Sequence, residues 1–354
     1  MEVFTASAPG AAPDPGEAII HRADPVFAIG NAPLIPSMAR ISGFDVVHIH
    51  YPFIFGSELT LLGRLSRKRR RQALLVHYKN RLVGKGARGA LFEIYEHTVA
   101  PRLIAAADRV CVLSDDHARS VSYLARVADR DPEKLIEMPN GVDTDLFSPG
   151  ADPSGLRARL GIPSDAVVAA FVATLDRAHH FKRLDVAIDA LARREADHVH
   201  LVVAGGGELL DGFQQQAASA GVADRVHFLG AVPHGELPDV LRAADLFLLT
   251  TEPPESFGIV LIEAMACGLP VVATDYPGVA AVVDQDETGL LVPRGDVEAV
   301  ASALATLADQ PNGRTEMGAR GREKAMREWS WPQLVDRMDG AYAEAIEARR
   351  RKTG

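Results

Sequence analysis

Short apolar runs alternate with amphipathic segments along almost the whole chain. The runs are rich in Val, Ile and Leu and are apolar on both faces, which is typical of parallel strands covered by helices. The segments between them have the apolar spacing of helices. This alternation predicts an α/β protein with doubly wound parallel sheets. The expected strands are residues 45–50, 74–78, 109–113, 135–139, 167–174, 199–204, 225–230, 246–250, 271–273 and 289–292.

A stretch rich in proline and glycine separates the first four of these strands from the others. It covers residues 148–155 and reads Ser-Pro-Gly-Ala-Asp-Pro-Ser-Gly. Such composition is typical of a boundary between domains. The length of 354 residues is also sufficient for two domains. We therefore expect one domain over residues 1–149 and another over residues 150–331.

Charge and cysteine content narrow the class of protein. The chain has 38 Lys and Arg against 47 Asp and Glu, a net charge of −9, which argues against a nucleic-acid binder. Cys111 and Cys267 lie in apolar contexts and are interpreted as buried thiols of a reducing compartment. No apolar run approaches the ~18 residues that span a bilayer, and no signal peptide is evident. We expect a cytoplasmic protein.

The sequence gives only weak support to a dinucleotide-binding site and to a metal site. Glycines 205–207 follow a strand, but Leu210 stands where a dinucleotide-binding fingerprint requires its last glycine. His48 and His50 share one face of a strand, as alternate residues do. The sequence shows no Cys/His cluster that completes a ligand set with them, so we expect structural histidines and no metal site.

Residues 255–274 carry the most informative chemistry. Gly258 is predicted to open a helix that runs to about Cys267. The free amides at its start would attract an anion, at the strand-to-helix edge where α/β sheets bind ligands. Glu255 lies just before this start and Glu263 lies inside the helix. Carboxylates pair with hydroxyls, and a nucleotide-sugar has hydroxyls at both ends of its diphosphate. The alternative is two solvated glutamates on an ordinary helix.

The full pattern resembles the retaining glycosyltransferases of the GT-B fold, the family-four group that includes many bacterial mannosyl- and glucosyltransferases. Supporting segments occur in the family's order at residues 45–52, 108–114, 138–149, 201–208, 225–233, 244–250, 270–279 and 287–296. The resemblance implies two Rossmann-like domains facing a cleft. The second domain would bind an NDP-sugar, with UDP or GDP expected, and the first would bind the acceptor. A final helix, at about 332–354, would join the first domain.

The resemblance also implies roles for individual residues. Glu255 would contact the donor hexose, Glu263 the ribose, and Lys182 would neutralise the leaving diphosphate. Gly205 and Gly207 would belong to the donor side. The main-chain amides implied to hold the hexose and diphosphate are those of Phe257, Gly258, Ile259 and Val260, and Ser256 is also placed on the donor side. In the front-face mechanism usually proposed for the family, the departing phosphate takes the acceptor's proton. No enzymic nucleophile, cofactor or metal is expected, and Asp143-Thr-Asp145 is interpreted as structural.

Two positions depart from the family pattern. The family usually carries an arginine ahead of the diphosphate lysine, where this chain has Thr174. Arg177 or Arg183 could supply the charge. On the acceptor side the family has a histidine in a strand ending Thr-Tyr-His, and the aligned residue here is Lys79. We favour His77 as an active-site residue with Lys79 beside it and His50 on the acceptor side; a packed strand histidine is the alternative for His77.

The two ends of the first domain raise further hypotheses. Residues 1–7 resemble the family's second strand, so a first strand, a glycine loop and a helix are expected upstream of Met1. The basic run Arg64–Arg71 is interpreted as a solvated helix end, with peripheral contact to an anionic membrane as the alternative. Residues 349–352 receive the same interpretation.

The sequence thus predicts a retaining, metal-independent hexosyltransferase that acts from a nucleotide-sugar on an acceptor hydroxyl. Thr174 in place of the family arginine, and the family elements expected upstream of Met1, leave an alternative open. This alternative is a non-catalytic nucleotide-sugar-binding protein. A GT-B-fold epimerase is a further alternative.

Overall fold

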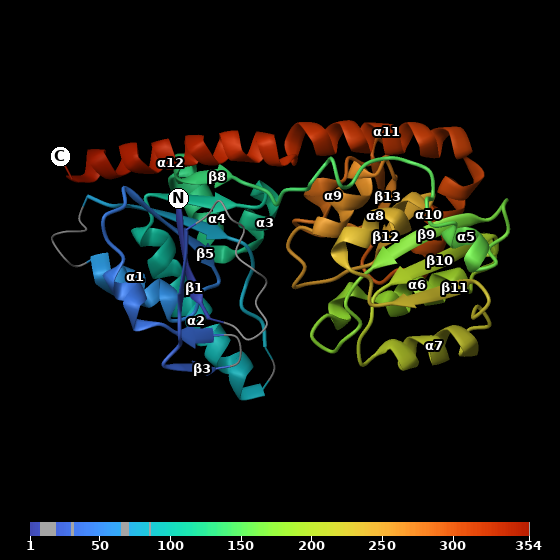
Figure 1. Ribbon diagram of the computed structural model, residues 1–354, viewed down its shortest axis with the longest axis horizontal. Helices are drawn as coiled ribbons and strands as arrows, with labels where there is room; N and C mark the ends of the chain where they lie inside the picture. Colours follow the sequence, from blue (N-terminus) through green and yellow to red (C-terminus); the bar gives the residue numbers. More distant parts are fainter. Residues whose placement is uncertain (8–18, 30–31, 65–70, 85, 354) are drawn as a thin grey trace. The chain divides into compact units, whose positions relative to one another are not determined.

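The computed structural model describes residues 1–7, 19–29, 32–64, 71–84 and 86–353 (Figure 1). The chain forms two compact units. Unit 1 comprises Met1–Met138 and Arg337–Gly354, and unit 2 comprises Pro139–Asp336. The predicted α/β class with parallel sheets is confirmed, and each of the ten strands expected from apolar runs is present.

Unit 2 contains a six-stranded sheet in the order β11-β10-β9-β12-β13-β14, with all neighbours parallel. The order runs one way from β9 and reverses at β12. This reversal is the topological switch point, the place where open α/β sheets bind ligands. The strands are β9 (Val167–Val172), β10 (Val199–Ala204), β11 (Val226–Gly230), β12 (Leu246–Leu249), β13 (Val271–Thr274) and β14 (Gly289–Val292).

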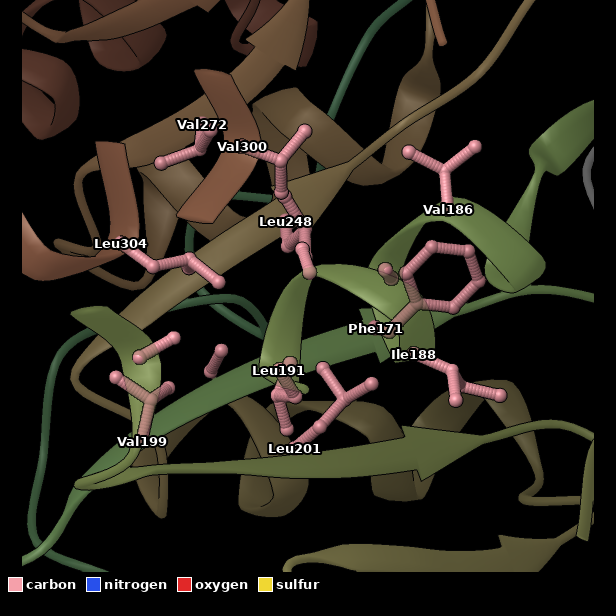
Figure 2. Close-up of a cluster of buried hydrophobic side chains, with 14 of the residues drawn as sticks. Phe171, Val186, Ile188, Leu191, Val199, Leu201, Leu248, Val272, Val300 and Leu304 are labelled. Carbon is pink, nitrogen blue, oxygen red and sulfur yellow. The ribbon is translucent and has the colours of Figure 1, made fainter. Parts of the chain in front are cut away.

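The core of unit 2 explains why its strands read as continuous apolar runs. Figure 2 shows Phe171 of β9, Leu201 of β10 and Leu248 of β12 beside helix residues such as Ile188 and Leu304. These five side chains are fully buried. Burying one such side chain stabilises the fold by about 1.5–3 kcal/mol. The helices are α5 (Leu156–Arg159), α6 (Leu184–Leu191), α7 (Leu210–Ser219), α8 (Leu237–Arg242), α9 (Ile259–Ala266), α10 (Val297–Asp309) and α11 (Pro311–Glu328).

Unit 1 contains a four-stranded parallel sheet in chain order: β5 (Val46–Tyr51), β6 (Ala73–Tyr78), β7 (Arg109–Val112) and β8 (Leu135–Glu137). Strand β6 is buried along its whole length. Tyr51 and Tyr78 stack in the core with ring centroids 5.1 Å apart. The helices of this unit are α1 (Gly56–Arg64), α2 (Gly86–Ala106), α3 (Asp115–Ser120) and α4 (Ser122–Arg130).

Four short strands precede this sheet. β1 (Glu2–Ala6), expected from the sequence, pairs in parallel with β2 (Ile19–Ala23), and β3 (Phe27–Ile29) pairs antiparallel with β4 (Ala32–Leu34). Sequence analysis missed the last three because β3 and β4 have only three residues each, and because polar residues in β2 and a proline in β4 interrupt the apolar run. Short 3-10 turns complete the fold at Pro36–Arg40, Pro132–Lys134, His180–Lys182, Arg194–Ala196, His234–Glu236 and Ala280–Val282.

The final helix, α12 (Trp331–Thr353), was predicted, and its later part contacts unit 1 through Asp108. The Asp108 carboxylate is completely buried and accepts the amide of Leu74 at 2.9 Å. It also pairs with Arg64 of α1 at 3.3 Å and with Lys352 of α12 at 3.1 Å, while Arg349 lies 3.7 Å away. One carboxylate therefore joins the start of β6, the end of α1 and the end of α12.

These contacts change the interpretation of the basic runs. Arg64 is only 8% exposed at its side chain because it faces Asp108, so it is not available to a membrane surface. Residues 65–70 of that run lie outside the described residues, and Arg71 is exposed. Arg349 and Lys352 likewise have an internal partner in Asp108. Within the described part of the chain, no helix has both the length and the hydropathy needed to cross a membrane.

We predict that Asp108→Asn lowers the free energy of unfolding of unit 1 by about 3 kcal/mol, because the buried Arg64 loses its counter-charge. Native-state hydrogen exchange of amides in β6 and β7 measures this loss. The matched control is Asp115→Asn, which removes an exposed i,i+4 pair with Arg119 and should leave these exchange rates unchanged. Equal effects of the two variants would contradict a role for Asp108 as the joining group.

Candidate functional site

Two loops of unit 2 meet at the switch point, one after β9 and one after β12. The amide of Glu252 donates to the carbonyl of Phe181 at 2.8 Å, and the Thr250 hydroxyl donates to the carbonyl of Arg183 at 2.7 Å. These bonds hold the two loops together at the carboxyl edge of the sheet. The chemistry-bearing residues of the two loops are thereby brought to one place.

Lys182 and Glu255, from these two loops, form an ion pair. Their side chains are only 16% and 13% exposed. Glu255 Oε1 also accepts the amides of Ser256 at 3.2 Å and Gly258 at 3.1 Å. Burial by itself would raise the pKa of Glu255, but the Lys182 charge and these hydrogen bonds outweigh it and lower the pKa. The Glu255 carboxyl is therefore ionised at neutral pH.

The helix α9 begins at this pair, and Gly258 sets its start. Gly258 has φ +79°, a conformation that L side chains rarely adopt, and an added Cβ would lie 3.1 Å from the side chains of Leu249 and Leu261. Phe257 is buried, and Ile259 is exposed. The first amides of α9 are thus fixed beside Glu255, as the sequence analysis expected.

Glu263 lies inside α9 with its carboxylate buried, and it accepts a hydrogen bond from His234 Nε2 at 2.8 Å. Burial raises the pKa of Glu263, although His234 and the charge of Lys182 act in the opposite direction. Sequence analysis missed His234. The only signal was its place just after β11, whose carboxyl end lies at the same edge of the sheet as those of β9 and β12.

The residues proposed to replace the family arginine have other partners. Thr174 is exposed at the end of β9. Arg177 is 84% exposed at its side chain and lies 3.5 Å from Glu208. Arg183 donates to Asp185 and, at 2.9 Å, to Glu252. Neither arginine pairs with Glu255 among the described residues, so Lys182 is the cation that these loops bring to Glu255.

Gly205 and Gly207 bring a third loop against the one after β9. A Cβ on Gly205 would lie 1.8 Å from the Ala173 carbonyl oxygen, and one on Gly207 would lie 2.3 Å from that of Leu175. Both distances are shorter than real contacts allow. The glycines therefore permit the backbone of residues 205–207 to pack beside Thr174.

Three histidines of unit 1 lie together on β5 and β6. His50 and His77 are register partners, and His48 lies on the same face of β5. Their ring centroids are 4.4 to 5.7 Å apart. His77 is 2% exposed, and its Nε2 donates to the carbonyl of Met138 at 2.9 Å. Burial, together with the charge of Lys79, lowers the pKa of His77 to about 2, so its imidazole is neutral at physiological pH.

The sequence analysis found no further histidine or cysteine to complete a ligand set with His48 and His50, but the structure brings His77 to them. One ring nitrogen from each of His48, His50 and His77 lies within 4.8 Å of the others. The third histidine comes from the neighbouring strand, far along the sequence, so no local spacing could reveal it. Asp143 accepts the amides of Asp145 and Leu146 at 3.1 and 3.0 Å, which accounts for that acidic motif as a turn. Cys111 and Cys267 are buried free thiols, as predicted.

Comparison with known proteins agrees with this geometry. Residues 155–324 match the family described as Glycosyl transferases group 1, and residues 1–146 match that described as Glycosyltransferase Family 4. This chain belongs to the family-four glycosyltransferases. The predicted family is thereby confirmed.

Named relatives and solved structures extend the comparison. A D-inositol 3-phosphate glycosyltransferase of Saccharomonospora viridis is 37% identical over 260 residues, covering 70% of this chain and 58% of the relative. One of Mycobacterium tuberculosis (strain ATCC 25177 / H37Ra) is 35% identical over 331 residues, covering 88% of this chain and 64% of the relative. The chain thus spans about three fifths of the length of these curated relatives.

The fold has close counterparts among solved structures. Sucrose-phosphate synthase from Thermosynechococcus elongatus superimposes with a TM-score of 0.71 at 26% identity, over 86% of this chain and 75% of that one. HepE of Anabaena, solved in complex with UDP, superimposes with a TM-score of 0.74 at 21% identity, over 92% and 86%. The predicted GT-B fold of two Rossmann-like domains is confirmed.

We predict that Lys182→Met lowers the free energy of unfolding of unit 2 by about 2–3 kcal/mol at neutral pH, because Glu255 stays buried without its counter-charge. The folded pKa of Glu255 is lowered in the native chain, so its stabilisation is fully present above the ordinary value of 4.5 and is lost as pH falls through the folded pKa. The difference in unfolding free energy between the native chain and the variant should therefore become smaller in acid. Denaturant unfolding across pH measures this difference.

The control for this experiment is the double variant Lys182→Met, Glu255→Gln. This double variant is compared with Glu255→Gln alone: glutamine carries no charge to titrate, so the pH dependence of the Lys182→Met effect should disappear. If the unfolding free energies of the native chain and of Lys182→Met differ by the same amount at every pH, the ion pair does not determine the stability of this site.

Proposed function

We propose that the chain is a retaining hexosyltransferase that uses a nucleotide-sugar donor and needs no metal ion at the donor diphosphate. The observation that supports this most directly is the Lys182–Glu255 pair at the switch point, beside the first amides of α9. It sets a cation and a carboxylate side by side, as binding of a diphosphate joined to a hexose would require. The family of the chain supports the same class of reaction.

Groups of unit 2 would bind the donor. Lys182 and the amides of residues 257–260 would hold the diphosphate, since helix starts attract anions. Glu255 would accept hexose hydroxyls, and Glu263 would accept ribose hydroxyls with His234 beside it. UDP is the first nucleotide to test, because the HepE structure of Anabaena contains it.

The proposed step breaks the bond between the anomeric carbon and the diphosphate oxygen, and the electron pair leaves with the diphosphate. Lys182 and the α9 amides stabilise the developing negative charge. The acceptor oxygen bonds to the anomeric carbon on the face that the diphosphate leaves, and its proton passes to the departing phosphate oxygen. This path retains the anomeric configuration and needs no nucleophile from the protein.

The acceptor is proposed to be a polyhydroxylated small molecule held by unit 1, with His50, His77 and Lys79 on the acceptor side. The first candidate is D-inositol 3-phosphate, which the names of the curated relatives contain. His77 would act as a neutral imidazole, because burial keeps its pKa far below neutrality.

A second candidate is a protein that binds the nucleotide-sugar without turnover. It is favoured by Thr174 at the position of the family arginine and by the ion pairs that occupy Arg177 and Arg183. An epimerase would differ from both, because it converts the donor without an acceptor. Product analysis separates the three functions.

We predict that UDP raises the melting temperature of the full chain, with or without Mg²⁺. We further predict that UDP-hexose with D-inositol 3-phosphate yields a glycoside of retained configuration, detected by NMR. Lys182→Met should lower kcat by about 10²-fold or more, since it removes charge stabilisation of the leaving group.

The matched control is Arg193→Met, which removes another cation of unit 2, paired with Glu298 in an exposed position, and should leave kcat unchanged. A nucleotide-dependent shift without any glycoside from a panel of acceptors would favour the binding protein. Donor conversion without an acceptor would favour the epimerase. The absence of a shift with UDP, GDP, ADP and dTDP would refute a donor site in unit 2.

A further inference from the structure

We propose that His48, His50 and His77 form a site for a divalent transition-metal ion of the Zn²⁺ class. The parallel register of β5 and β6 places His50 opposite His77, and the two-residue period of β5 adds His48 on the same face. One ring nitrogen of each lies within 4.8 Å of the others. Three imidazoles without a carboxylate favour zinc, copper, nickel or cobalt over magnesium and calcium.

The hydrogen bonds of His77 prepare it as a ligand. Its Nε2 must donate to the Met138 carbonyl, which leaves a lone pair on Nδ1. That Nδ1 is buried and has no hydrogen-bond partner within the described residues. Metal-binding histidines commonly use the other ring nitrogen to donate to a carbonyl, which fixes the tautomer and the ring orientation.

His48 has the same arrangement in the tautomer whose Nδ1–H donates to the Tyr342 hydroxyl. Its Nδ1 lies 3.1 Å from the hydroxyl of Tyr342, and its Nε2 is buried without a partner in the part of the chain that the structure describes. Buried polar atoms without partners are rare and call for an explanation. Two of them in neighbouring rings are both satisfied if a metal ion accepts their lone pairs.

The dimensions and the access of the site also fit. Zn–N bonds of about 2.0–2.1 Å place two ligand nitrogens of a tetrahedral site about 3.4 Å apart, so nitrogens within 4.8 Å need only modest side-chain rotation. His50 is exposed and gives an ion access from solvent. A three-histidine set leaves a fourth position open for water or a substrate oxygen.

The positive charge of Lys79 opposes the binding of a metal ion. The cation of Lys79 acts electrostatically on all three histidines. This charge should weaken metal binding. A variant without it should therefore bind the ion more tightly, which gives a second test of the site. The proposed site goes beyond the transferase reaction because it adds a metal ion to His50 and His77, which the proposed function places on the acceptor side. Its three ligands belong to unit 1, whereas the donor groups Lys182 and Glu255 belong to unit 2.

The test uses the full chain without a histidine tag, stripped with a chelator and titrated with Co²⁺ alone. We expect one equivalent to bind with the visible absorption of tetra- or five-coordinate cobalt, and Zn²⁺ to displace it. His77→Gln and His50→Gln should each weaken binding about tenfold or more, and Lys79→Met should strengthen it.

The control is His200→Gln, which alters the other close histidine pair, His200–His227 of β10 and β11, and should leave the titration unchanged. His50 is exposed, so its variant keeps the test valid if His77→Gln does not fold. Absence of saturable Co²⁺ binding, or binding that survives both variants, would overturn the proposal. The Co²⁺ titration and the Zn²⁺ displacement involve neither a nucleotide nor glycosyl transfer. A negative result for the metal site is therefore distinct from a failure of the proposed function.

Discussion

The reversal of strand order between β9 and β12 is the constraint on which the site of unit 2 depends. Crossovers from the two central strands leave in opposite directions, so the loops after them diverge and leave room at the sheet edge. The hydrogen bonds from Glu252 and Thr250 then set the spacing of these loops. Lys182 and Glu255 meet because their backbones are fixed there, in a unit whose overall charge is negative. Local geometry, and not the field of the whole domain, supplies the positive charge.

The sequence predicted the parts of this fold that depend on local pattern. Each apolar run became a strand, and Gly258 and Gly268 bound the helix of residues 259–266 because both need positive φ. The motif also predicted that Lys182 and Glu255 belong to one site. What the sequence could not reveal depends on tertiary contact. His234 reaches Glu263 across the sheet edge, and His77 joins His48 only through the pairing of β5 with β6.

Buried charge serves different ends in the two units. In unit 1, Asp108 is enclosed by partners from three elements and holds the end of α12. Among the described residues, Glu255 of unit 2 has a single cationic partner and two amides at the start of a helix. The first arrangement is saturated and suits a permanent joint. The second can exchange its cation for another group, because the loops that carry it are tied to each other by their backbones.

That exchange has a consequence for turnover. Under the proposed reaction, an intact donor takes Lys182 away from Glu255 but offers hexose hydroxyls to the carboxylate in return. The nucleoside diphosphate left after transfer also competes for Lys182, yet it has no hexose to offer, so the buried Glu255 would keep its two amide hydrogen bonds but lose its counter-charge. The return of Lys182 to Glu255 then favours departure of the product. The ion pair of the empty site would thus act as a built-in competitor that opposes product inhibition.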